Sequence, residues 1–411
     1  MTMTPQDFLK INIFSIGLIL FYATVLIFML FWLLSGFRIL TYKSAAILLL
    51  GYVTFLAFGL LNSIFQFIQI PPDTVVYGAI IIDPPKFVMY SLGVKTYATI
   101  NFFPFLLCLR YPIVFVTFSI FYYFLGMLLI WRGYSRLILY AGKRVSPTFL
   151  YLYMILAMAY PMAIITIPTL LRESLMVLSL GISFNLFTMI FCKIKLGLIR
   201  NILLVIALLI LLGVRPVMGI CFVLSAWLSV SFFGKGKKVN MGKVLRLLVA
   251  GSLLLVCLMF VVQKLYTITF SLQWLNLFRN SYIPIHGDEG YGYNMDWENP
   301  IHIVINFVIL FMQYLLSPVP FLFPAAVSFR KFLAWVDVFF IVILLLIIFF
   351  KKDLPYKKML LFFIFINLVI PSVFETHVTG AFRHRMNGIV LLMPMAAYAL
   401  SRFFIKSKTE P

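Results

Sequence analysis

Residues 339–352 read FFIVILLLIIFFKK, an uninterrupted apolar run that ends in two lysines. The apolar stretch extends back to about residue 333. Its length approaches the roughly 20 apolar residues that a helix needs to cross a bilayer. Lysines directly behind such a helix are typical of the cytoplasmic end of a membrane span. The stretch therefore predicts a membrane helix over 333–350 whose C-terminal end faces the cytoplasm.

The same pattern recurs along the whole chain of 411 residues, which is 64% hydrophobic, 18% aromatic and only 11% charged. This composition excludes a water-soluble globule. We predict an all-α fold, a polytopic membrane bundle of about eleven helices (10–12) in a single domain over 1–411. The predicted helices are 11–34, 44–67, 111–131, 147–167, 174–191, 201–214, 216–233, 247–265, 333–350, 359–373 and 387–404. The first of them has no cleavage site behind it and is expected to be retained.

Alternate connectors between these helices carry most of the 33 basic residues. The basic connectors lie within 38–43, 132–144, 193–200, 235–246, 351–358 and 402–408. Since cytoplasmic connectors collect Lys and Arg, this set faces the cytoplasm, with the N-terminus outside and the C-terminus inside. All four histidines and most acidic residues then belong to the outer side, where we expect the chemistry.

Other function classes find little support. The net charge of +21 is spread over short connectors, whereas a nucleic-acid binder concentrates its cations on one surface. Cys108, Cys192, Cys221 and Cys257 lie in or beside apolar runs without a CxxC pair, so neither a disulfide nor a metal site is expected. The sequence has no P-loop, HExxH or GxSxG motif, and no cofactor is expected.

Two outer regions are long, 68–110 and 266–332. The alternation of sides implies that 301–316 is not one simple crossing, so we expect a re-entrant or interfacial element or a tight hairpin. The second region also holds the most polar segment of the chain, 286–293, which reads HGDEGYGY. We expect 266–332 to form a large periplasmic loop that acts as a lid. Its candidates for catalytic acid–base work are His286, Asp288 and Glu289, preferred over Asp296.

Arg215 follows the short apolar run 201–214. At about 1.5 Å per residue this run rises about 21 Å, less than the roughly 30 Å of a hydrocarbon core. Arg215 is therefore predicted to lie below the outer surface, where an arginine is costly and indicates function rather than a snorkelling side chain. Arg172 and Glu173 open the helix 174–191 on the same side.

Further cations on the outer side are predicted to join Arg215, because the planar guanidinium binds phosphate oxygens with two parallel hydrogen bonds. The predicted ligands of a lipid pyrophosphate are Arg172, Arg215, Arg279, Arg383 and Arg385. Secondary acid–base candidates on this side are Glu173, Glu375, His377 and His384. The residues of the 375–385 cluster could instead belong to a solvated loop, and Arg172 and Glu173 could be a charge pair at an interface.

Several short motifs occur together in the chain. They are Leu171-Arg172-Glu173, the short paired helices around Arg215, the Gly/Tyr segment of the large loop, Leu316-Ser317-Pro318-Val319-Pro320, and Phe382-Arg383-His384-Arg385 before a last helix with Pro394. In this combination they resemble the Wzy-type polymerases of bacterial O-antigen and related surface polysaccharides. The resemblance implies a metal-independent membrane transferase of the GT-C type in the bacterial inner (plasma) membrane. Such enzymes join glycan repeat units carried on undecaprenyl pyrophosphate at the periplasmic face, and a Wzz-type chain-length regulator is an expected partner.

The implied reaction is glycosyl transfer in which the polyprenyl pyrophosphate leaves and arginines neutralise its charge. Related lipopolysaccharide ligases place a histidine in the large outer loop, but the surroundings of His286 differ from their motif. Two other functions stay open. A lipid-linked oligosaccharide flippase is expected to have two similar halves, and a GT-C transferase using a polyprenyl-monophosphate sugar is expected to have an acidic pair in the first outer loop. Asp73 and Asp83 are there, in proline-rich settings typical of turns.

Overall fold

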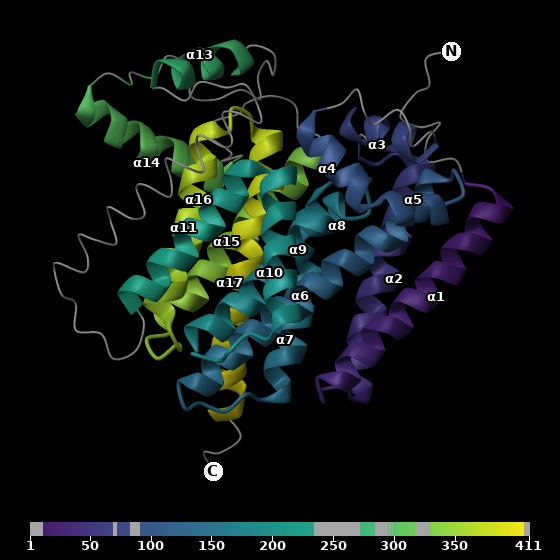
Figure 1. Cartoon of the computed structure of the whole chain (residues 1–411), viewed down its shortest axis with the longest axis horizontal. Coiled ribbons are helices and arrows are strands. Elements are labelled where there is room, and N and C mark those ends of the chain that lie inside the picture. Colours follow the sequence, from purple (N-terminus) through teal and green to yellow (C-terminus); the bar gives the residue numbers. More distant parts are fainter. Residues whose placement is uncertain are drawn as a thin grey trace. The chain divides into compact units, whose positions relative to one another are not determined.

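A computed structural model describes residues 11–68, 72–82, 91–233, 272–283, 295, 297, 299–317 and 329–406. All regular elements in these ranges are helices (Figure 1). The chain divides into two compact units. Unit 1 comprises 1–214, 347–352 and 393–411, and unit 2 comprises 215–346 and 353–392. The predicted all-α class is confirmed for the described residues.

The helices of unit 1 are α1 (Ile13–Gly36), α2 (Tyr42–Phe65), α3 (Pro72–Ile82), α4 (Leu92–Ile100), α5 (Phe102–Leu107), α6 (Phe115–Tyr140), α7 (Pro147–Ala159), α8 (Pro161–Thr166), α9 (Glu173–Phe191) and α10 (Leu198–Val214). Those of unit 2 are α11 (Pro216–Phe233), α13 (Leu272–Tyr282), α14 (Pro300–Leu316) and α16 (Lys357–Phe374), with most of α15 (Phe329–Phe350) and the first half of α17 (Val378–Lys406).

Among the described residues, eight helices are long and apolar enough to cross a membrane, which indicates a multi-pass membrane protein. They are Ile13–Gly36, Tyr42–Phe65, Pro112–Tyr140, Glu173–Phe191, Pro216–Phe233, Phe332–Phe350, Lys357–Phe374 and Val378–Phe404. Helix α10 and the pair α7 and α8 are shorter than this limit. The predicted helix 247–265 lies outside the described residues.

The boundaries differ from the sequence prediction where proline or a polar stretch intervenes. The predicted helix 147–167 is two helices, because Pro161 has no N–H to continue α7 and instead begins α8. The last helix begins at Val378 rather than 387, so the polar 378–386 segment is helical. The run 301–316 is one helix without an internal turn. Asp73 lies in the first turn of α3, where a carboxylate favours the helix N-terminus, rather than in a turn.

Unit 1 is built around α6 and α9, whose backbones approach closely at two glycines. A Cβ atom on Gly126 would lie 2.6 Å from the Val177 carbonyl oxygen, and one on Gly181 would collide with the Gly126 carbonyl. Small residues permit this contact between apolar helices. Figure 1 shows α3, α4 and α5 gathered at one end of unit 1, the end where α1 begins. Cys108 and Cys192 are buried residues of unit 1.

In unit 2, α16 packs against α11 and α14. The Asn367 side-chain amide of α16 donates a 2.8 Å hydrogen bond to the Ser225 hydroxyl of α11. Nearby, the rings of Phe222 and Phe363 meet edge to face with centroids 5.3 Å apart. These contacts hold α16 in place, and the candidate functional residues lie where α16 ends and α17 begins.

Candidate functional site

A buried carboxylate lies at the junction of α16 and α17. Glu375 directly follows the last residue of α16, and its N–H donates to the Pro371 carbonyl at 3.1 Å, so the end of the helix positions it. The His377 Nδ1 atom lies 3.1 Å from Glu375 Oε1, and His384 Nδ1 contacts Glu375 Oε2. The Glu375 side chain is 5% exposed, whereas those of His377 and His384 are 23% and 31% exposed. One carboxylate thus orients two accessible imidazoles.

The first turn of α17 approaches this carboxylate closely because residue 380 is glycine. A Cβ atom on Gly380 would collide with Glu375 Oε1 and would lie 2.7 Å from His377 Cε1. The Thr376 N–H also donates to Glu375 Oε1 at 3.2 Å. The absence of a side chain at 380 is therefore a condition for the carboxylate to sit between the two histidines.

The Glu375 carboxyl is held ionised. Burial alone would raise its pKa, but the charge and hydrogen bonds of His384 and His377 outweigh burial and hold the pKa of Glu375 well below its ordinary value of 4.5. A carboxylate that is ionised at neutral pH fixes the orientation of each imidazole, as the carboxylate does in hydrolytic triads. In its neutral form, His384 can then accept a proton at its remaining ring nitrogen.

Arg279 links the described helix of the large loop to this junction. Its Nη1 atom donates 2.7 Å hydrogen bonds to the carbonyls of Val373 and Glu375, and the side chain is 1% exposed. These carbonyls belong to the C-terminal end of α16, where a helix lacks internal donors and favours a cation. Arg279 therefore anchors α13 beside Glu375, and its guanidinium is engaged by the protein itself.

Arg385 is also engaged by protein groups. Its Nε and Nη2 atoms donate to the Asp337 carboxylate at 3.0 and 2.5 Å, and both side chains are fully buried. Its Nη1 atom donates to the carbonyls of Tyr314, Leu315 and Ser317 at the end of α14. Arg385 thus joins α14, α15 and α17.

Arg215 and Arg383 supply the positive charge next to the histidines. Arg215 is buried at the start of α11, and its charge acts on both His384 and Tyr314. Arg383 is half-buried beside His384 in α17 and acts on the same imidazole. The structure therefore brings together the predicted residues Arg215, Arg279, Glu375, His377, Arg383, His384 and Arg385 within unit 2.

Arg172 and Glu173 belong to unit 1 and form a cluster of their own. Arg172 Nη1 donates to the Val214 carbonyl at 3.4 Å, and Gly93 of α4 leaves room for this contact, since a Cβ there would lie 2.8 Å from Arg172 Nη1. Glu173 is fully buried as the first residue of α9. Helices α4, α9 and α10 together position Arg172.

The predicted catalytic residues His286, Asp288 and Glu289 lie outside the described residues, as does Asp296. Sequence reasoning missed Asp337, which is the partner of Arg385, and Tyr314, whose buried hydroxyl lies near Arg215 and Glu375. A lone Asp inside an apolar run was a detectable signal, because such a residue is expected to pair with a cation. A tyrosine in a helix gives no comparable signal.

No protein-family model, curated protein or solved structure matches the chain. Within the described ranges, no group of His, Cys, Asp and Glu side chains could hold a metal ion.

Proposed function

We propose that this protein polymerises oligosaccharide repeat units carried on undecaprenyl pyrophosphate, at the periplasmic face of the bacterial inner membrane. The observation that carries the proposal is the Glu375 cluster, in which a buried carboxylate orients accessible His377 and His384 next to Arg215 and Arg383. This combination supplies a general base and fixed positive charge side by side. Both accelerate glycosyl transfer from a pyrophosphate.

In the proposed reaction a hydroxyl of the incoming lipid-linked repeat attacks the anomeric carbon of the growing chain. The new glycosidic bond forms as the bond from the anomeric carbon to the pyrophosphate oxygen breaks. His384, whose Nδ1 faces Glu375, accepts the hydroxyl proton at Nε2. Arg215 and Arg383 stabilise the negative charge of the departing pyrophosphate.

The remaining arginines take different parts in the proposal. Arg279 and Arg385 already donate to protein carbonyls and to Asp337, so we assign them a positioning role. Arg172, in unit 1, stays a predicted pyrophosphate ligand.

The predicted bases of the large loop are His286, Asp288 and Glu289. Each of these residues, and Asp296, is mutated singly, and polymer formation is measured. If all four variants polymerise normally, the loop serves recognition or closure.

The length distribution of lipid-linked glycan in cells without this protein tests the function. A polymerase predicts that single repeat units accumulate on the lipid, at the outer side of the membrane. Loss of all glycan from the outer side would identify a flippase and overturn the proposal.

Complementation with Arg215→Ala and Arg172→Ala, each checked for membrane accumulation, then tests the arginines. Arg→Lys should restore polymer only in part, because an ammonium keeps the charge but loses the planar fork.

A further inference from the structure

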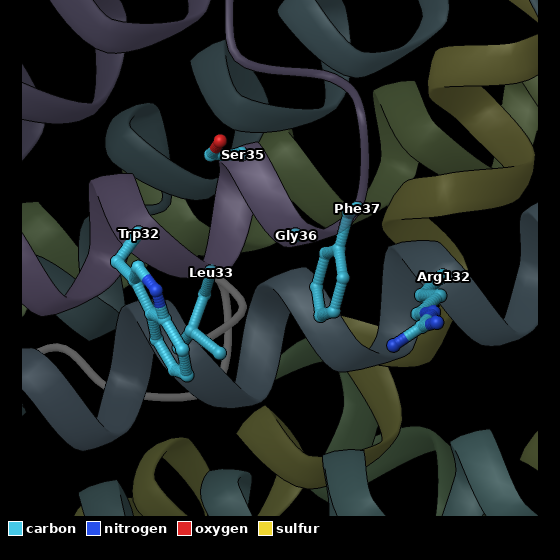
Figure 2. A pocket seen from close by; sticks show the side chains of 6 residues that line it. All are labelled: Trp32, Leu33, Ser35, Gly36, Phe37 and Arg132. Carbon is cyan, nitrogen blue, oxygen red and sulfur yellow. The ribbon is translucent and has the colours of Figure 1, made fainter.

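A cavity of about 310 Å³ lies at the C-terminal end of α1, against α6. Its lining residues are Trp32, Leu33, Ser35, Gly36, Phe37 and Arg132 (Figure 2). All of them belong to unit 1, and none belongs to the Glu375 cluster. The volume is within the range of small-ligand sites. The cavity combines an apolar wall, made by Trp32 and Leu33, with one cationic side chain.

The Arg132 guanidinium stacks on an aromatic ring beside this cavity. Its guanidinium carbon lies 4.1 Å from the centroid of the Phe37 ring. Figure 2 labels both side chains. Stacking on the face of the ring leaves the in-plane N–H groups free to form hydrogen bonds. Within the described part of the chain, Arg132 makes no hydrogen bond and no ion pair, and its side chain is exposed.

The carbonyls at the end of α1 do not need Arg132. Three of them accept hydrogen bonds from the chain that follows: Phe37 N–H to Leu33, Arg38 N–H to Ser35 and Ile39 N–H to Leu34, at 2.8–3.0 Å. Arg38 adopts a left-handed conformation, with φ of 58°, to close this turn. The guanidinium is therefore not the cap of the helix, and its N–H groups can donate to a ligand.

The charges around Arg132 are also positive. Arg200 and Arg136 both lie within electrostatic range of it. Arg136, one turn further along α6, is held by the Asn185 carbonyl at 2.6 Å and the Thr188 hydroxyl at 2.7 Å. Like charges repel, so an anion bound beside Arg132 relieves the repulsion.

The exposed side chains of α1 indicate which kind of molecule the anion belongs to. Phe21, Phe28 and Trp32 are 60%, 66% and 75% exposed, and their spacing of seven and four residues places them on one stripe of the helix. The stripe leads to the cavity, and tryptophan at the end of a membrane helix is typical of the headgroup level. An apolar stripe that ends at a cationic cavity fits the acyl chains and the phosphate of one lipid.

We infer that this cavity binds the phosphate of an anionic phospholipid, with Arg132 as its hydrogen-bond donor. The acyl chains lie along the stripe of Phe21, Phe28 and Trp32, and the phosphate accepts from the stacked guanidinium. Basic pockets between membrane helices bind anionic headgroups in this way. The site is separate from the proposed glycan chemistry and does not depend on it.

Lipid retention by the purified full-length chain tests the inference. The protein is placed in nanodiscs of equal parts phosphatidylglycerol and phosphatidylcholine, re-extracted, and its co-purifying lipids are quantified by mass spectrometry. We expect wild type to retain phosphatidylglycerol in excess. Arg132→Gln should weaken this preference about fivefold, the effect of about one basic residue near a membrane surface. Arg132→Lys should be intermediate, because it keeps the charge but loses the planar stack.

Two controls make the result decisive. Arg144→Gln removes an exposed cation of the 132–144 basic segment that does not line the cavity, and it should leave retention unchanged. Phosphatidylglycerol added to the detergent-purified protein should raise its unfolding temperature. Inorganic phosphate, added at the same concentration in place of phosphatidylglycerol, should not raise it. Equal losses in the Arg132 and Arg144 variants would overturn the inference. Stabilisation by inorganic phosphate that matches that by phosphatidylglycerol would also overturn it. Size-exclusion profiles confirm that each variant is folded.

Discussion

At the scale of residues, the polar groups around Glu375 stabilise one another in a buried position. A buried carboxylate is stabilised only if charges and donors replace its hydration, and here His377, His384 and the Thr376 N–H do so. The buried pair of Arg385 and Asp337 follows the same rule. Each cluster therefore depends on every member, which makes single substitutions informative.

Glu375→Gln should lower the thermal stability of the protein in a pH-dependent way. Because the folded pKa of Glu375 lies below its ordinary value, the ionised carboxylate stabilises the fold fully above about pH 4.5. That contribution is lost as the pH falls through the folded pKa. The difference in unfolding temperature between wild type and variant should thus be largest near neutral pH and shrink as the pH falls below 4.5. A difference that grows on acidification would contradict the ionised state.

Asp337→Ala should destabilise the fold by about 3–5 kcal/mol, because it leaves the guanidinium of Arg385 buried without its counter-charge. The measurement is the yield and unfolding temperature of the purified variant. The matched control is the double variant Asp337→Leu with Arg385→Met, which removes both charges and should recover much of the loss. A single variant as stable as wild type would show that the pair contributes little.

Some of this site could be predicted from the sequence and some could not. The histidines, Glu375 and the arginines stood out because charge on the predicted outer side runs against the bias of membrane connectors. The sequence singled out Arg215 by its depth, but it did not show that protein groups engage Arg279 and Arg385. The hydrogen bonds of Arg279 and Arg385 to carbonyls and to Asp337 indicate a positioning role that the sequence did not reveal.

At the scale of elements, helix positions followed hydrophobic runs because a membrane helix must be apolar over its whole length. The predicted helices 216–233 and 174–191 agree with α11 and α9 to within a residue. The errors fall where helices are short or polar. Helices α3, α4 and α5 lack a membrane-length run, and the start of α17 is too polar for hydropathy to find.

Gly181→Ala should destabilise unit 1 by about 1–3 kcal/mol, because the added methyl group meets the Gly126 backbone of α6 and forces the helices apart. Gly17→Ala is the matched control within α1, where a Cβ atom meets nothing within 4 Å. Unfolding temperatures of the two purified variants give the comparison. Equal stability of both variants would contradict the close packing of α6 on α9.

At the scale of the whole molecule, the asymmetry of charge is the feature from which the orientation is predicted. A charged, membrane-impermeant maleimide applied from the periplasm should label single cysteines introduced at Asp288 and Thr379 but not at Lys237 or Lys352. Cys108, Cys192 and Cys221 are buried and give a low background, and Cys257 is replaced by serine. Labelling at Lys352 from the periplasm would reverse the orientation and place the Glu375 cluster on the cytoplasmic side.

The central claim is that one protein joins lipid-linked repeats by means of its Glu375 cluster, and a reconstituted reaction tests it most directly. The purified protein is incubated with undecaprenyl-pyrophosphate-linked repeat units, and glycan length is followed on gels. Wild type should produce a ladder of polymers, and His384→Ala should slow its growth by about a hundredfold or more, the usual contribution of a general base. His302→Ala, which removes an exposed histidine of α14, should polymerise normally. A wild-type rate in the His384→Ala variant, or no ladder from the wild-type protein, would contradict the account.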